Sequence, residues 1–283
     1  MLGFPGAATL GPAIETRLLT DAAVAPGGAW ALVFGADGET AAVVRDLLKT
    51  PVDTDLGEVP TGARVLFSES GDSALLVSAG GSNIQWITGL PNTPAVGPVI
   101  ELGAQTGGLL PIAIGNGGKH LILSEVANER QTLYWTPANR IELHPLGQFV
   151  HVSAICLSED DRDAAVADDG ANEFVVLRDV YGFASRITLA QAGDGVDRPA
   201  GAGFAGNRVF VTNGDSASVL VFDRHTLNVT HTLQVPAAPV RCERIGKDLF
   251  LLTNTGLPSV YVLDLSAEPR IVFIPLGELY AAK

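Results

Sequence analysis

Apolar and polar residues alternate along most of the chain, in short runs that glycine-rich or polar turns separate. One stretch in the C-terminal third reads VFVTNGDSASVLVFD, and the stretch that follows it reads LFLLTNTGLPSVYVLD. Asn213 of the first matches Asn254 of the second. At the same spacing, Asp223 matches Asp264. Alternation with a period of two predicts β-strands, and a paired run that recurs at a fixed spacing predicts a repeat protein.

The paired run recurs six times, at a spacing of roughly 40–45 residues. The first strand of each pair ends at Gly35, Ala79, Glu125, Asp168, Asn213 and Asn254, and the second ends at Arg45, Thr88, Thr136, Arg178, Asp223 and Asp264. Another apolar run precedes each pair, and a further β-type run follows most of them. Four short strands per unit of this length are typical of a blade of a β-propeller, in which radial packing buries both faces of each sheet.

The sequence therefore predicts an all-β fold, a β-propeller of four-stranded antiparallel blades that forms a single domain over residues 1–283. Six blades are favoured, and seven blades, one of them degenerate, are the alternative. Residues 1–20 contain one β-type run, which we expect to be an N-terminal strand or extension that closes or flanks the ring. No stretch of useful length has the 3.6-residue period of a helix.

The stretch VFVTNGDSASVLVFDRHTLNVTHTLQVPAAPV resembles the YVTN-type β-propeller repeat, whose consensus is an aromatic residue and V-T-N, followed by S-V-x-V-x-D-x-x-T. The match is strong only over residues 208–277. Propellers of this kind often belong to bacterial cell-surface or secreted proteins, and related ones include lactonases and domains of redox enzymes. The resemblance implies a scaffold in an extracytoplasmic protein, periplasmic or secreted, and it does not imply one activity.

Composition narrows the classes of partner. The net charge of −13 would repel a polyphosphate backbone, so we expect no nucleic acid partner. The longest apolar runs are shorter than the roughly 18 residues that suggest a membrane span, so no membrane insertion is expected. We expect a monomer that binds an unknown protein or a small-molecule ligand.

Two further features concern the compartment. Cys156 and Cys242 have no metal-type spacing and lie in apolar strand patterns, which favours free buried thiols over the alternative of a disulfide. The N-terminal sequence MLGFPGAATLGP lacks a basic start followed by a long apolar run, so we expect no signal peptide in this chain.

Propellers often bind at one face, around the mouth of the central channel, and the loops that lead into the innermost strands supply the contacts. The repeat spacing places seven polar residues there: Asp21, Arg64, His151, Ser153, Arg198, Arg241 and Glu243. A ring of arginine, histidine and carboxylate groups can hold an anionic or sugar-like ligand by bidentate contacts. The alternative is that these residues are solvated and partly paired with one another.

No cofactor is predicted, and a divalent cation is the open alternative. Residues 158–173 are rich in carboxylates, which suit Ca²⁺, but they lack the spacing of a calcium loop, so a solvated acidic turn is favoured. A lactonase-type metal site needs Glu, Asn and Asp on one ion. Asn213, Asn254 and Asp168 share one position of the repeat, where a strand-end cap is the favoured role.

The chain contains no G-x-S-x-G nucleophile elbow and no H-E-x-x-H zinc motif. The favoured function is therefore a non-catalytic binding or interaction scaffold that holds a ligand or a protein at one channel face. The alternatives are a metal-dependent, lactonase-like hydrolase and a structural module of a cell surface.

Overall fold

The computed structural model describes residues 19–35, 39–47, 49–60, 63–79, 81–102, 109–138, 142–254 and 259–275. These residues form 24 strands in six four-stranded antiparallel sheets, each built from four strands that are consecutive in the chain. We call the sheets blades 1 to 6 in chain order.

The strands have the following bounds. Blade 1 contains β1 (Leu19–Val24), β2 (Ala31–Gly35), β3 (Thr40–Arg45) and β4 (Val52–Glu58). Blade 2 contains β5 (Arg64–Phe67), β6 (Ser73–Val77), β7 (Asn83–Thr88) and β8 (Ala95–Glu101). Blade 3 contains β9 (Leu110–Ile114), β10 (His120–Ala127), β11 (Arg130–Pro137) and β12 (His144–Phe149). Blade 4 contains β13 (Val152–Leu157), β14 (Asp163–Asp168), β15 (Glu173–Arg178) and β16 (Ser185–Gln191). Blade 5 contains β17 (Pro199–Ala205), β18 (Arg208–Asn213), β19 (Ser218–Asp223) and β20 (Val229–Gln234). Blade 6 contains β21 (Pro239–Arg244), β22 (Leu249–Asn254), β23 (Ser259–Asp264) and β24 (Arg270–Pro275).

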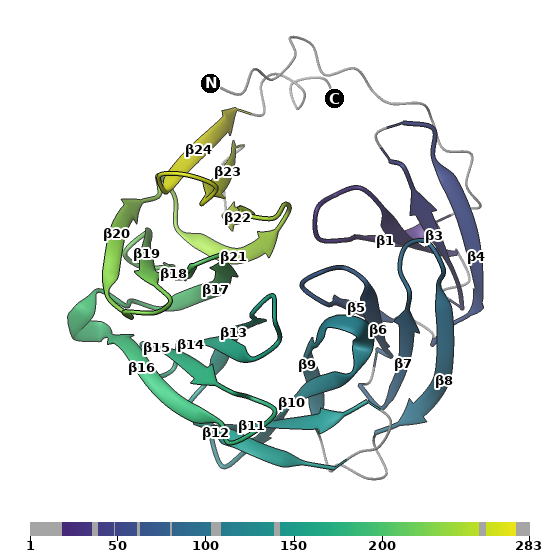
Figure 1. The fold of residues 1–283 in the computed structure, drawn as a ribbon, viewed down its shortest axis with the longest axis horizontal. Coiled ribbons are helices and arrows are strands. Elements are labelled where there is room, and N and C mark those ends of the chain that lie inside the picture. Colours follow the sequence, from purple (N-terminus) through teal and green to yellow (C-terminus); the bar gives the residue numbers. More distant parts are fainter. Residues whose placement is uncertain are drawn as a thin grey trace.

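The six sheets stand around a common centre (Figure 1). The first strand of each sheet faces the centre and the fourth lies at the periphery (Figure 1). This arrangement is that of a β-propeller and is consistent with six blades. It explains the burial pattern: β6 is buried at every residue, whereas the peripheral β20 alternates between exposed and half-buried residues. A middle strand has a neighbouring sheet on both faces, so it reads as a continuous apolar run.

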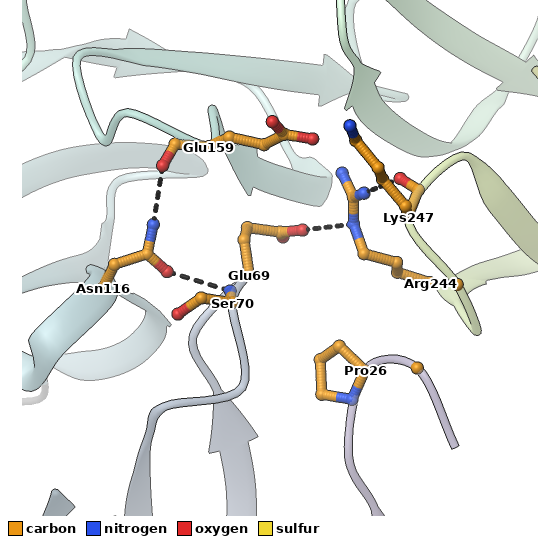
Figure 2. A pocket seen from close by; sticks show the side chains of 9 residues that line it. Pro26, Glu69, Ser70, Asn116, Glu159, Arg244 and Lys247 are labelled. Atoms are coloured by element: carbon orange, nitrogen blue, oxygen red, sulfur yellow. Dashed lines mark hydrogen bonds and ion pairs between the residues drawn. The ribbon is translucent and has the colours of Figure 1, made fainter. Parts of the chain in front are cut away.

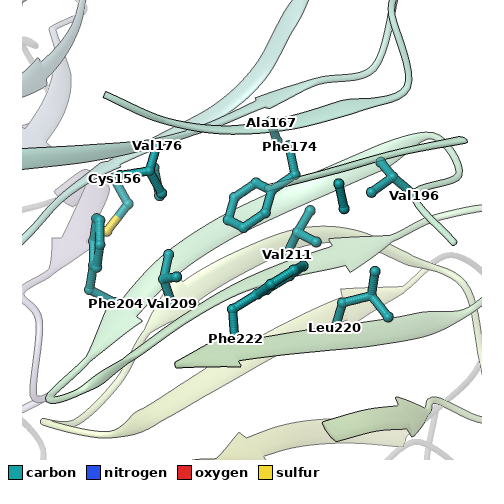
Figure 3. Packing of buried hydrophobic residues seen from close by; sticks show 12 residues of the cluster. Cys156, Ala167, Phe174, Val176, Val196, Phe204, Val209, Val211, Leu220 and Phe222 are labelled. Carbon is teal, nitrogen blue, oxygen red and sulfur yellow. The ribbon is translucent and has the colours of Figure 1, made fainter. Parts of the chain in front are cut away.

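The core is divided among the contacts between successive blades. Between blades 4 and 5, Phe174 of β15 packs against Phe222 of β19, with ring centroids 5.5 Å apart (Figure 3). Phe204 of β17 and the thiol of Cys156 of β13 belong to the same cluster (Figure 3). Burial of a phenylalanine side chain contributes about 1.5–3 kcal/mol, so these contacts hold neighbouring sheets together.

The repeat spacing predicted the strands closely. Nine of the twelve expected strand ends lie at the last residue of a strand; the exceptions among the first strands are Ala79, two residues beyond β6, and Glu125, inside β10. Among the second strands, Thr136 lies one residue before the end of β11.

 The agreement is close because alternation and turn residues are local properties of the sequence.

Other expectations about the fold have mixed outcomes. The described residues form six sheets, and no seventh occurs among them. They contain no α-helix, only two three-residue 3₁₀ turns, Asn116–Gly118 and Ala192–Asp194, and none of their helices could span a membrane. Residues 1–18 lie outside the described residues, so their expected closing or flanking role stays a prediction. Residues 19 and 20 belong to β1, which is the innermost strand of blade 1.

The central channel has two distinct ends, because neighbouring innermost strands run in the same direction. At one end, Ser153 near the start of β13 donates a hydrogen bond to the carbonyl of Pro199 at the start of β17. At the other end, the loop after β5 is bonded to the turn after β9 through Ser70 and Asn116. We call these ends the start face and the end face of the channel.

Candidate functional site

Six of the seven residues predicted around the channel mouth lie in the first half of an innermost strand or just before one, toward the start face, whereas Glu243 is the next-to-last residue of β21. Asp21, Arg64, Ser153, Arg241 and Glu243 lie in innermost strands, and His151 and Arg198 lie just before such strands. Four of the side chains take part in three ion pairs within their own blades. His151 Nδ1 lies 2.5 Å from Asp169 Oδ1, and Arg241 Nε lies 2.8 Å from Glu243 Oε1. The third pair joins Arg198 Nε to Asp215 Oδ1 at 3.0 Å.

Two of the others contact the backbone of the next blade. Arg64 donates from a terminal guanidinium nitrogen to the carbonyl of Pro111, 2.7 Å away. The hydroxyl of Ser153 donates to the carbonyl of Pro199. Asp21 accepts a hydrogen bond from the N–H of Ala22. Within the described part of the chain, Arg241 and Glu243 are the only two of the seven that are joined to each other by an ion pair or a hydrogen bond. The predicted ligand ring at the start face therefore stays a prediction.

The carboxylate and amides considered for a metal also have structural partners. Asp168 accepts hydrogen bonds from the N–H groups of Val150 and His151. Asn213 accepts one from the N–H of Asp197 and donates to the hydroxyl of Ser218. Both side chains are buried and hold the loop that leads into the innermost strand of their blade. The residues that the structure describes contain no group of three or more His, Cys, Asp or Glu side chains suited to a metal.

A cavity of about 340 Å³ opens at the end face of the channel. Its walls come from the loops that leave the innermost strands of blades 1, 2, 3, 4 and 6. The lining residues are Pro26, Gly27, Glu69, Ser70, Asn116, Glu159, Arg244, Gly246 and Lys247 (Figure 2). Blade 5 contributes a backbone carbonyl, that of Phe204, which accepts a hydrogen bond from Arg244. All six blades therefore take part in the cavity or its support.

An ion pair lies at the base of the cavity. Arg244 Nε donates to Glu69 Oε2 at 2.8 Å, and the Arg244 side chain is only 8% exposed (Figure 2). The terminal guanidinium nitrogens donate to the carbonyls of Phe204 and Lys247, and the guanidinium lies 4.8 Å from the ring centroid of Phe250. Each nitrogen of this guanidinium has a partner, so Arg244 fixes the base of the cavity.

Two thiols lie behind this ion pair. The Sγ of Cys156 lies 3.0 Å from Glu69 Oε1, to which the thiol donates. Burial raises the pKa of the Cys156 thiol well above its usual value, and the negative charge of Glu69 raises it further. The same two causes raise the pKa of Cys242. Both cysteines are free, as the sequence predicted, and both stay protonated at neutral pH.

Asn116 ties three loops together at the side of the cavity. Its Oδ1 accepts a hydrogen bond from the N–H of Ser70 in blade 2, and its Nδ2 donates to the carbonyl of Glu159 in blade 4, both at 2.9 Å (Figure 2). Its own N–H donates to Asp161 Oδ2 at 2.6 Å. The next residue, Gly117, donates its N–H to Asp72 of blade 2. These bonds hold the walls in place without a ligand.

The carboxyl of Asp161 titrates in an unusual range. Burial raises its pKa to about 6, and the nearby charges of Asp72, Asp160 and Glu69 add to the rise, while the hydrogen bond from Asn116 opposes it. Asp161 therefore changes its charge close to neutral pH, beside a residue that ties the cavity walls.

The acidic segment 158–173 divides as the repeat spacing predicted. Residues 159–161 precede β14 and lie at the end face. Asp168 is the last residue of β14, and residues 169–173 follow it at the start face. The acidic turn is more than a solvated surface, however. Asp160 and Asp163 form ion pairs with Arg224 of the neighbouring blade at 3.1 Å and 2.9 Å, respectively.

Sequence reasoning missed the lining of the end-face cavity. Apart from Arg244, the last residue of β21, its residues occupy one position of the repeat, the turn between the first and second strands of a blade, which reads SESGD, NGGKH, SEDD or IGKD in four of the blades. The repeat spacing therefore contained a signal for the whole set. It did not single out this end of the channel, because such turns are also the ordinary connections of a blade.

Solved structures with the same architecture have low sequence identity to this chain. Hydrazine synthase of Kuenenia stuttgartiensis matches with 15% identity and a TM-score of 0.57, over 87% of this chain and 83% of that chain. A functionally unknown protein from Desulfotomaculum acetoxidans matches with 15% identity and a TM-score of 0.55, over 95% and 87% of the two chains.

A third match is PorZ, an essential bacterial surface component of the type-IX secretion system of Porphyromonas gingivalis. It has 11% identity and a TM-score of 0.56, and the match covers 93% of this chain but 34% of PorZ. At these identities the likeness shows the fold alone, a β-propeller-like one. No protein-family model and no curated protein sequence matches the chain. The resemblance to the YVTN-type repeat therefore stays a prediction that rests on residues 208–277.

Proposed function

We propose that this protein is a six-bladed β-propeller that acts as a binding module and holds a small ligand in the end-face cavity. The observation that carries the proposal is the convergence of loops from five blades on one cavity of about 340 Å³. Clefts that bind small molecules have volumes of about 300–1,000 Å³ and are largely formed before the ligand arrives. The bonds of Asn116 and the Glu69–Arg244 pair supply that preformed shape.

An extracytoplasmic location is part of the proposal. It is supported by the resemblance of residues 208–277 to repeats of bacterial surface and secreted proteins, and by the likeness in fold to PorZ, a bacterial surface component. Neither similarity identifies a ligand.

The test is ligand-observed NMR with the purified protein and four separate mixtures: amino acids and dipeptides, neutral sugars, monocarboxylic acids, and primary amines. Ser70→Trp fills the cavity from an exposed position, and Asn92→Trp places the same side chain on an exposed loop outside it. We expect at least one mixture to show saturation transfer with the parent protein and with Asn92→Trp, and to lose it with Ser70→Trp.

Two outcomes overturn the proposal. If no mixture gives a signal with the parent protein, the cavity is not a site for these small-molecule classes. If a signal persists in Ser70→Trp but is lost in Arg241→Ala, the ligand binds at the start face, where the sequence predicted a ring of polar residues. Thermal unfolding of each variant checks that it is folded.

A further inference from the structure

The charges of the end-face cavity divide into a satisfied pair and an unsatisfied pair. Four lining residues carry a charge, and two of them, Glu69 and Arg244, neutralise each other at the base. The other two are Glu159 of blade 4 and Lys247 of blade 6, both exposed. Within the described residues, neither the carboxylate of Glu159 nor the ammonium of Lys247 has a hydrogen-bond or ion-pair partner.

The backbones of these two residues are nevertheless fixed. The carbonyl of Glu159 accepts a hydrogen bond from Asn116 Nδ2 at 2.9 Å. The carbonyl of Lys247 accepts one from the guanidinium of Arg244. Figure 2 shows both side chains extending from these anchored positions toward the same part of the cavity, one from each side. The two charged ends are thus held near one opening, with their hydrogen-bonding capacity unused.

This pattern selects for the charge of a ligand. A ligand with only a carboxylate would bind Lys247 but would lie close to the negative charge of Glu159, and a ligand with only an amine would meet the reverse conflict. A ligand with one ammonium and one carboxylate satisfies both groups and adds no net charge to the cavity. Charge-assisted hydrogen bonds of this kind are stronger than those between neutral groups, and like charges that lie next to each other weaken binding.

The rest of the lining fits the body of such a ligand. Pro26 supplies an apolar surface, and Gly27 and Gly246 leave room at the wall because they carry no side chain. A volume of about 340 Å³ is sufficient for an amino acid or a dipeptide. Since the base is already neutral and every Arg244 nitrogen is bonded, the ligand's two charges are left to Glu159 and Lys247.

From this juxtaposition we infer that the cavity binds a small zwitterion, an amino acid or a short peptide with free ends, whose ammonium contacts Glu159 and whose carboxylate contacts Lys247. The inference rests on the proposed function, because it assigns a ligand class to the same cavity.

The test uses isothermal titration calorimetry with alanyl-leucine and with its two blocked forms, the N-acetyl dipeptide and the dipeptide amide. The variants are Glu159→Gln and Lys247→Gln. The matched controls are Glu101→Gln on the exposed outer strand β8, and Lys119→Gln, which lies at the end face outside the lining. All four positions are exposed, so each variant is expected to fold.

We expect each block and each cavity variant to weaken binding about tenfold, whereas the controls bind as the parent protein does. The losses of affinity should be paired by contact. Blocking the ammonium with an acetyl group should have little further effect in Glu159→Gln, and blocking the carboxylate as an amide should have little further effect in Lys247→Gln. A merely structural role of either residue would not produce this pairing.

The opposite results overturn the inference. They are equal affinity for free and blocked dipeptides, parent-like affinity in both cavity variants, or no heat with the free dipeptide. Failure of the inference alone is distinguishable from failure of the proposed function. In the first case, neutral or singly charged compounds still give NMR signals that Ser70→Trp abolishes, and in the second case no mixture gives such a signal.

Discussion

Individual polar residues at the end face act mainly through the backbone groups that they hold. The side-chain oxygen and nitrogen of Asn116 both form hydrogen bonds with loops of other blades. The three guanidinium nitrogens of Arg244 donate to partners in blades 2, 5 and 6. Buried polar groups stabilise a structure only when their hydrogen bonds are made. Asp161 at the end face differs, because its Oδ1 is buried and accepts no hydrogen bond from any described residue.

The titration of Asp161 leads to a prediction about pH. In the folded protein its carboxyl keeps its proton up to about pH 6, whereas in the unfolded chain it loses the proton near the ordinary value of 3.8. The folded state therefore binds more protons between these values, and the contribution of Asp161 to the free energy of unfolding falls as the pH rises through them.

Asp161→Asn removes this titration and keeps an oxygen that can accept from Asn116. We expect the variant to match the parent protein near pH 4 and to be more stable by roughly 1 kcal/mol at pH 7, a value reduced for solvent screening of a half-buried carboxyl. Urea unfolding at a series of pH values measures the difference. Asp179→Asn, at another aspartate with a left-handed backbone, controls for the preference of asparagine for that conformation. A difference that does not change with pH would contradict the expectation.

At the scale of elements, the innermost strands and their loops have different tasks. The strands lie side by side around the channel and carry the loops to a common end, whereas hydrogen bonds between loops set the shape of that end. The loops after β5, β9 and β13 are bonded to one another through Asn116, Gly117 and their partners. A change in one turn is therefore transmitted to two other blades.

Asn116→Ala tests this cross-link between loops. The variant loses two hydrogen bonds, and we expect a loss of stability of about 1–2 kcal/mol, since each bond contributes roughly 0.5–1.5 kcal/mol. Hydrogen exchange of the N–H of Ser70 should become faster, because that donor loses its acceptor. Asn92→Ala, on an exposed loop of blade 2, is the control. Unchanged exchange at Ser70 would show that the loops keep their positions without Asn116.

At the scale of the whole molecule, stability comes from the contacts between sheets. Five apolar clusters each join two successive blades, and the cluster between blades 4 and 5 contains Phe174, Phe204 and Phe222. Because each sheet depends on its neighbours for the burial of its faces, a defect in one cluster affects the association of two blades.

Phe222→Ala measures the strength of one such contact. The side chain is fully buried, so we expect a loss of about 3–5 kcal/mol in the free energy of unfolding, from lost burial and the cavity left behind. Phe183→Ala is the matched control, because Phe183 is 98% exposed and its replacement should change stability by no more than about 0.5 kcal/mol. Chemical unfolding compares the two. Similar losses in both variants would mean that the cluster does not hold the blades together.

Much of the fold could be predicted from the sequence because its signals are local. Alternation marks the strands, and continuous apolar runs such as β6 and β19 mark those with a sheet on both faces. The strand ends at Asp168 and Asn213 were predicted at the correct residue. Both side chains are buried and accept hydrogen bonds from backbone N–H groups of the segment that precedes an innermost strand. Two boundaries shifted where the turn between the second and third strands was longer or shorter than in the other repeats, at Ala79 and Glu125, and a third shifted by one residue at Thr136.

The candidate site was not predictable to the same extent. The sequence by itself determined the number of strand pairs, the all-β class and the positions of the turns, since these follow from periodicity within a few residues. Only the tertiary structure decided which turns form a cavity. Glu69 and Arg244 are separated by 175 positions in the chain, and they meet because the ring brings the ends of its innermost strands together. A contact of that separation depends on the closure of the ring, and no local pattern encodes it.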